Sequence, residues 1–166
     1  MRWKNIALLV FIATASLVGC KISFTGASIP PDAKTISVSF FPNNAAVVQP
    51  TLSQSFTEAL RDIFISQTTL SLIGSNGDLS FEGAITDYRV SPVAIQADVA
   101  SSNRLSVTVN VIFTNKKDPT KDFEQNFTRF VDFPSSQNLA SIEAELIRQV
   151  NEQLVQDIFN KAVINW

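Results

Sequence analysis

Apolar and polar residues alternate from residue 34 onward, and this alternation predicts the first strand of the fold. Apolar side chains occupy every second position, and polar side chains fill the positions between them: Ile36, Val38 and Phe40 against Thr35, Ser37 and Ser39. A period of two residues is typical of a half-buried strand. The segment Pro42-Asn43-Asn44 then predicts its end, because these residues favour turns.

A helical pattern follows from Thr51 to about Gln67. Thr51 and Gln54 have the spacing of a capping box, so we expect the Thr51 side chain to cap the helix. Apolar residues recur at steps of three or four, which indicates one buried helix face: Leu52, Phe56, Ala59, Leu60, Ile63 and Phe64. The segment 74–77 marks the next turn, since it contains two glycines and an asparagine.

Three further runs read as strands. In the first, Leu79, Phe81 and Ile85 share one parity and Tyr88 and Val90 share the other. If both sets face the core, the change of parity predicts a bulge in the segment 83–87. The second run, 105–113, alternates most regularly, and together with the third, 123–133, it predicts a hairpin around the turn 115–120.

The last predicted element is a helix from about Asn138 to Val163, with apolar residues at helical spacing. The resulting order β-α-β-β-β-α predicts an α+β fold in which two helices cover one face of a four-stranded sheet, mostly antiparallel or mixed. The other face is then either solvated or docked against a polar protein wall. It would carry Thr35, Ser37, Ser39, Ser106, Thr108, Asn110, Glu124, Asn126 and Thr128.

The N-terminal segment has the pattern of a lipoprotein signal peptide. Arg2 and Lys4 precede an apolar run that ends in Leu17-Val18-Gly19-Cys20, and the run is shorter than the roughly 20 residues of a membrane-spanning helix. We therefore expect removal of residues 1–19 and attachment of acyl chains to Cys20. Residues 20–33 then form a lipidated tether, and 34–166 form a single α+β domain.

Composition argues against most kinds of catalysis. The chain has no histidine and one cysteine, which excludes a Ser-His-Asp or Cys-His site and leaves the commonest zinc ligand absent. A formal net charge of −2 is not typical of a nucleic-acid-binding protein. The carboxylate pairs Glu143/Glu145 and Asp122/Glu124 are typical of a solvated surface. We expect no enzyme, no cofactor and no metal.

One basic cluster lies at the tip of the predicted hairpin, formed by Lys116, Lys117 and Lys121. It is either a charged turn that keeps the strand edge from pairing with other chains, or a contact for anions such as lipid phosphate groups.

Several segments resemble the lipopolysaccharide-assembly lipoprotein family LptE, in its Bacteroidetes form, over nearly all of the chain after Cys20. They are 24–31 (Phe-Thr-Gly-Ala-Ser-Ile-Pro-Pro), 41–44, 51–60, 90–94, 113–117 and 160–166. The resemblance implies a periplasm-facing outer-membrane lipoprotein that plugs the β-barrel LptD, helps it assemble, and assists lipopolysaccharide transport to the cell surface. It also implies two helices on a four-stranded sheet. Of the site residues, only Cys20 carries over.

A second hypothesis from the residues is a stand-alone periplasmic lipoprotein that binds a lipid or another envelope ligand in a groove between the sheet and the helices.

Overall fold

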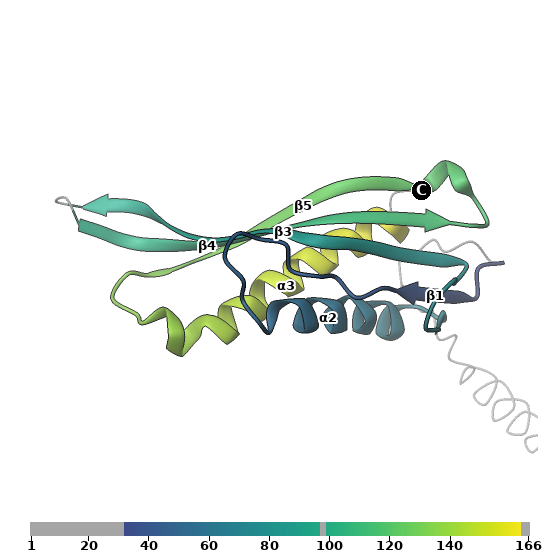
Figure 1. The fold of residues 1–166 in the computed structure, drawn as a ribbon, viewed down its shortest axis with the longest axis horizontal. Helices are drawn as coiled ribbons and strands as arrows, with labels where there is room; N and C mark the ends of the chain where they lie inside the picture. The colour runs from purple at the N-terminus through teal and green to yellow at the C-terminus, as the bar shows by residue number, and fades with distance from the viewer. Residues whose placement is uncertain (1–31, 97–98, 164–166) are drawn as a thin grey trace, which may run out of the picture.

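Two helices lie on one face of a single mixed sheet (Figure 1). The computed structural model describes residues 32–96 and 99–163, so the predicted signal peptide, Cys20 and most of the predicted tether lie outside the described residues. Within the described residues the elements are β1 (Thr35–Val38), α2 (Leu52–Gln67), β2 (Ser71–Leu72), β3 (Leu79–Gln96), β4 (Val99–Asn115), the 3-10 helix η1 (Pro119–Lys121), β5 (Phe123–Pro134) and α3 (Leu139–Val163).

The sheet order is β2-β1-β3-β4-β5. Strand β1 runs parallel to both β2 and β3, whereas β3–β4 and β4–β5 are antiparallel. The predicted α+β class, the hairpin and the two helices on one face are confirmed. The predicted number of four strands is wrong, because β2 adds a fifth. It comprises two residues, too few to show any alternation in the sequence.

The predicted bulge is present in β3. The register against β4 shifts between Ile85 and Asp87, which turns Tyr88 to the same face as Ile85, and both side chains are buried. The preceding Gly83 has a φ of 149°, a backbone angle that residues with a Cβ rarely adopt.

Two local predictions fail at the start of the fold. Phe40 is 59% exposed and Phe41 is fully buried, because β1 ends at Val38 and the alternation ends with it. The capping box does not form. The Thr51 hydroxyl donates to Gln49 Oε1 at 2.9 Å, and the Gln54 amide donates to Glu58.

Aromatic rings fill the space between the helices and the sheet. Phe64 of α2 lies 4.9 Å from Phe81 of β3 and 5.1 Å from Phe159 of α3, measured between ring centroids. Phe81 in turn contacts Phe113 of β4 at 4.8 Å. This packing fixes both helices on one side and leaves the opposite side of β3, β4 and β5 uncovered by any described helix. None of the helices within 32–96 and 99–163 has the length and apolar character needed to cross a membrane.

Candidate functional site

The uncovered side of β3, β4 and β5 is the candidate functional surface, and we call it the open sheet face. Side chains of directly paired residues share a face, so the buried pair Phe81 and Phe113 marks the helix side, and the next pair, Glu82 and Ile112, marks the open side. The same alternation assigns the following residues to the open sheet face: Ser80, Glu82, Ala84, Asp87, Arg89, Ser91, Arg104, Ser106, Thr108, Asn110, Ile112, Thr114, Glu124, Asn126, Thr128, Phe130 and Asp132.

Uncharged polar side chains form two rungs at the centre of this face. The hydroxyl oxygens of Thr108 and Thr128 lie 2.9 Å apart, and the Asn110 amide donates to Asn126 Oδ1 at 3.0 Å. These contacts hold the side chains in defined positions. Hydroxyl and amide groups retain further donors and acceptors, so a partner placed against the rungs has several hydrogen bonds available to it.

An arginine and a phenylalanine form one end of the face. The Arg104 guanidinium binds Asp132 with two hydrogen bonds of 2.7 and 2.8 Å and stacks over the Phe130 ring at 3.6 Å from its centroid. Its hydrogen bonds lower the pKa of the Asp132 carboxyl. Phe130 remains 45% exposed. Exposed aromatic and arginine side chains are enriched at protein interfaces.

The predicted polar face is correct on β4 and β5, apart from Ser106, which is buried, but not on β1. Ser37 is buried, and its hydroxyl oxygen accepts from the Gly77 amide. Asp78 holds the start of β1 by accepting from the amide of Lys34 and the hydroxyl of Thr35, both at 2.9 Å. These bonds, together with Lys117, lower the pKa of Asp78. The loop before β3 therefore covers β1, which the sequence pattern does not reveal.

The three lysines of the predicted basic cluster have different surroundings. Lys116 Nζ donates to the carbonyl oxygen of Asn76 at 2.8 Å, and Lys117 Nζ lies 3.2 Å from Asp78 Oδ1. Lys121 instead lines a hollow of about 150 Å³ together with Lys161. Two of the lysines thus secure the loop before β3, and the third faces α3.

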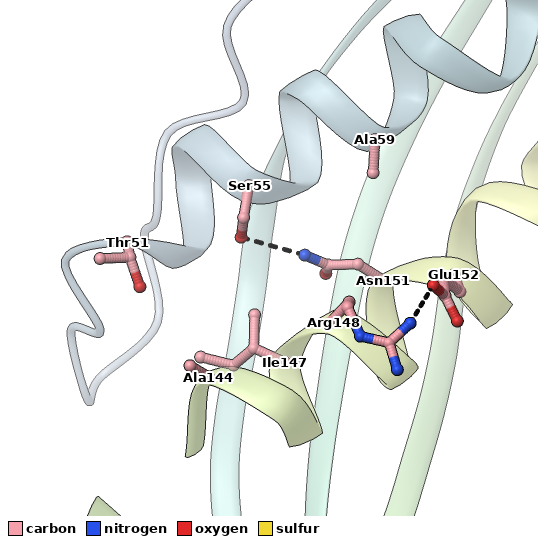
Figure 2. A pocket seen from close by; sticks show the side chains of 8 residues that line it. All are labelled: Thr51, Ser55, Ala59, Ala144, Ile147, Arg148, Asn151 and Glu152. Carbon is pink, nitrogen blue, oxygen red and sulfur yellow. Dashed lines mark hydrogen bonds and ion pairs between the residues drawn. The ribbon is translucent and has the colours of Figure 1, made fainter. Parts of the chain in front are cut away.

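A groove between α2 and α3 was not predicted (Figure 2). Its volume is about 400 Å³, and it is lined by Thr51, Ser55, Ala59, Ala144, Ile147, Arg148, Asn151 and Glu152. A second hollow of about 410 Å³ shares Ala59 and Glu152 with it, so the groove continues along the helices. The small side chains of Ser55 and Ala59 on α2 and of Ala144 on α3 leave this space empty. Such residues give no signal in the sequence, because they also occur in ordinary helices.

Asn151 lies at the base of this groove and is only 2% exposed. Its amide nitrogen donates to Ser55 Oγ at 3.1 Å. Its amide oxygen has no hydrogen-bond partner among the described residues.

The model of the lipopolysaccharide-assembly family LptE matches residues 33–162. This chain belongs to the LptE family. The sequence resemblance to this family is therefore confirmed, and LptE is a family of lipopolysaccharide assembly and not of enzymes. No curated protein matches the chain at a significant level.

Three solved structures show the same fold as this LptE-family chain. A minor lipoprotein from Acinetobacter baumannii has a TM-score of 0.51 at 15% identity, covering 78% of this chain and 91% of that one. An uncharacterized lipoprotein B from Nitrosomonas europaea has a TM-score of 0.52 at 14% identity, covering 86% and 88%. A hypothetical protein from Chlamydia trachomatis has a TM-score of 0.52 at 10% identity, covering 78% and 98%. At these identities the likeness extends to the fold alone.

Proposed function

We propose that this LptE-family chain is an outer-membrane lipoprotein that plugs the β-barrel LptD, helps that barrel assemble, and assists lipopolysaccharide on its way to the cell surface. In this proposal Cys20 carries the lipid anchor and the folded part faces the periplasm. The role is one of binding and positioning, without catalysis. The observation that carries the proposal is the polar open sheet face in a chain of the LptE family.

A polar face suits a barrel lumen for a physical reason. The interior of an outer-membrane barrel is polar, and polar groups that lose water on docking are destabilised unless they regain hydrogen bonds. The rungs Thr108–Thr128 and Asn110–Asn126 present uncharged donors and acceptors on a rigid sheet. Uncharged groups also lose less hydration energy on burial than carboxylates or ammonium groups do.

Co-purification with LptD tests the proposal, using the full chain expressed in its own host and extracted in mild detergent. Asn126→Asp places a charge on the central rung, 3.0 Å from Asn110. If that rung is buried in the complex, we expect about tenfold less LptD, because an unpaired buried charge destabilises a complex by at least about 1.4 kcal/mol.

Gln153→Glu is the matched control, since it adds the same charge at an exposed position of α3. It should leave the yield of LptD unchanged. Absence of LptD from the wild-type preparation would contradict the proposal.

The lipid anchor on Cys20 has its own test. Mass spectrometry of the protein purified from its host should show a chain that begins at Cys20 and carries acyl groups. A free thiol at Cys20 would refute the anchor, and with it the membrane attachment.

We also propose Lys116, Lys117 and Lys121 as contacts for the phosphate groups of lipopolysaccharide. A phosphate would have to compete with Asn76 and Asp78 for the first two ammonium groups. Replacing all three lysines by glutamine should weaken lipopolysaccharide binding. Unchanged binding by the triple variant would remove these residues from the site.

The alternative function is a stand-alone lipoprotein that binds a lipid or another envelope ligand. The expected groove between sheet and helices does not support it, because the rings of Phe64, Phe81 and Phe159 fill that space. The groove between α2 and α3 offers a different place (Figure 2). Native mass spectrometry separates the two functions: a monomer with a bound lipid and without LptD would favour the alternative.

A further inference from the structure

Strand β5 forms a long outer edge of the sheet (Figure 1). It has 12 residues and pairs with β4 on one side only. The opposite edge is formed by β2, which has two residues. Beyond Ile85 the side of β3 that faces away from β4 is also unpaired among the described residues, but Pro92 and the register shifts there interrupt it. Strand β5 is therefore the long edge without such interruptions.

The hydrogen bonds of β3 show which backbone groups of β5 point outward. The Ile85 amide donates to the Pro42 carbonyl, and the Ile85 carbonyl accepts from the Asn44 amide, both at 2.9 Å. The backbone groups of Ile85 thus point away from β4. Its partner Val109 must then direct its own groups toward β5, where it pairs with Phe127.

Backbone groups alternate in direction along a strand, so the neighbours of Phe127 direct theirs away from β4. The register between β4 and β5 continues through 12 pairs without a shift, and the alternation therefore holds along the whole strand. Five residues present outward N–H and C=O groups, and all five are exposed: Glu124, Asn126, Thr128, Phe130 and Asp132. Within the described residues, no hydrogen bond satisfies these groups.

Protein sheets usually protect such an edge with a short strand, a bulge, a proline or a lysine. The other elements show two of these devices: β2 is short, and the β3–β4 ladder has three register shifts. Strand β5 has no bulge, no lysine, and no proline before Pro134. Its one cation, Arg129, is bound to Asp157 at 2.5 and 2.7 Å. The edge is thus open to pairing.

We propose that β5 accepts an extended segment of the LptD partner as a sixth strand of the sheet. This inference rests on the proposed function. It adds which kind of LptD segment binds and how, namely an extended segment that pairs through its backbone. Every wall strand of a closed barrel is already paired on both sides, so the added strand must come from a loop or a chain terminus of the partner. Side chains opposite the carboxylates of Glu124 and Asp132 should be basic or uncharged, and an apolar side chain fits beside Phe130.

A second copy of this chain fits the edge less well. Antiparallel pairing of two β5 strands at full overlap sets Thr128 opposite itself and Glu124 opposite Asp132 at both ends. Facing carboxylates destabilise a strand pair. Charge complementarity therefore favours a partner segment without acidic residues at these positions.

Hydrogen–deuterium exchange on the wild-type complex with LptD is the decisive measurement. The amides of Asn126, Thr128 and Phe130 should exchange at least about tenfold more slowly in the complex than in the free chain, because a closed ladder must open before they exchange. This readout requires no variant to fold.

Two variants at one position separate backbone pairing from side-chain docking. Thr128→Pro removes an outward N–H that the fold does not use, and prolines are tolerated on edge strands. It should lower the yield of LptD by about tenfold, the effect of roughly one lost hydrogen bond. Thr128→Val keeps the backbone donor and loses the same hydroxyl, so it measures the side-chain contribution alone. Thr128→Pro should lower the yield several-fold further than Thr128→Val does.

The remaining outcomes are distinguishable. A complex in which the β5 amides exchange as fast as in the free chain overturns the added strand and leaves the proposed function intact. No complex with wild-type protein overturns both. Protection that rises with the concentration of the isolated chain assigns the edge to a second copy, and also overturns the inference.

Discussion

Replacing Asn151 by leucine should stabilise the protein. Asn151 is buried where α2 and α3 meet, and its amide oxygen has no partner among the described residues. Removing a buried acceptor of this kind should raise the free energy of unfolding by about 1–3 kcal/mol. Leucine also has the higher helix propensity, by up to about 0.5 kcal/mol. The adjoining groove of about 400 Å³ has room for the altered side-chain shape.

The opposing term is the hydrogen bond from Asn151 to Ser55, measured at 3.1 Å. Losing a neutral hydrogen bond destabilises a protein by about 1 kcal/mol. The Ser55 hydroxyl still donates to the carbonyl oxygen of Leu52 at 3.2 Å, so no new buried donor is left unpaired. The net expectation is a gain of about 1 kcal/mol in the free energy of unfolding.

Equilibrium unfolding in urea, followed by circular dichroism, measures this change. A gain of this size raises the midpoint by about 0.5 M urea. Gln153→Leu, at an exposed position of the same helix, is the control for adding a leucine to α3; it should leave the free energy of unfolding nearly unchanged, because glutamine and leucine have similar helix propensities. If Asn151→Leu lowers the free energy of unfolding by about 1 kcal/mol or more, the amide oxygen has a partner such as a buried water, and the reasoning fails.

Three further changes have outcomes that follow from the structure. Gly83→Ala should lower the free energy of unfolding by about 3 kcal/mol or more, because its Cβ would lie 2.0 Å from the Asn110 carbonyl oxygen. A free energy of unfolding within about 1 kcal/mol of the wild-type value, measured by thermal unfolding, would contradict this. Phe81→Ala should lower it by about 3–5 kcal/mol in urea, since the ring is fully buried against Phe64 and Phe113, and an effect below about 1 kcal/mol would indicate a loosely packed core. Asp78 stabilises the fold only when ionised, because hydrogen bonds lower its pKa in the folded chain. Its contribution is therefore complete above the unfolded pKa of about 4 and is lost as the pH falls further. In urea titrations, the advantage of wild type over Asp78→Asn should be constant from pH 6 to 8 and shrink below about pH 4, and an advantage independent of pH would contradict this.

The sequence by itself determined the elements whose apolar pattern is long and regular. The helix near the C-terminus was expected from about Asn138 to Val163, and α3 spans Leu139–Val163. The change of parity between Ile85 and Tyr88 was sufficient to predict the bulge in β3. Such patterns are visible locally because each residue's burial depends on the period of its own element. Membership of the LptE family could also be predicted, because the resemblance depends on the residues alone.

Tertiary structure alone decided which polar groups are left to bind a partner. Ser37 alternates with apolar residues as Thr108 and Asn110 do, yet the loop before β3 buries Ser37 and leaves the other two partly exposed. Likewise, β2 exists only because two residues meet the edge of β1. The open edge of β5 depends on which strand is placed outermost. Strand order, loop cover and helix spacing arise from contacts between residues far apart in the chain. A periodic pattern within one segment does not reveal these contacts.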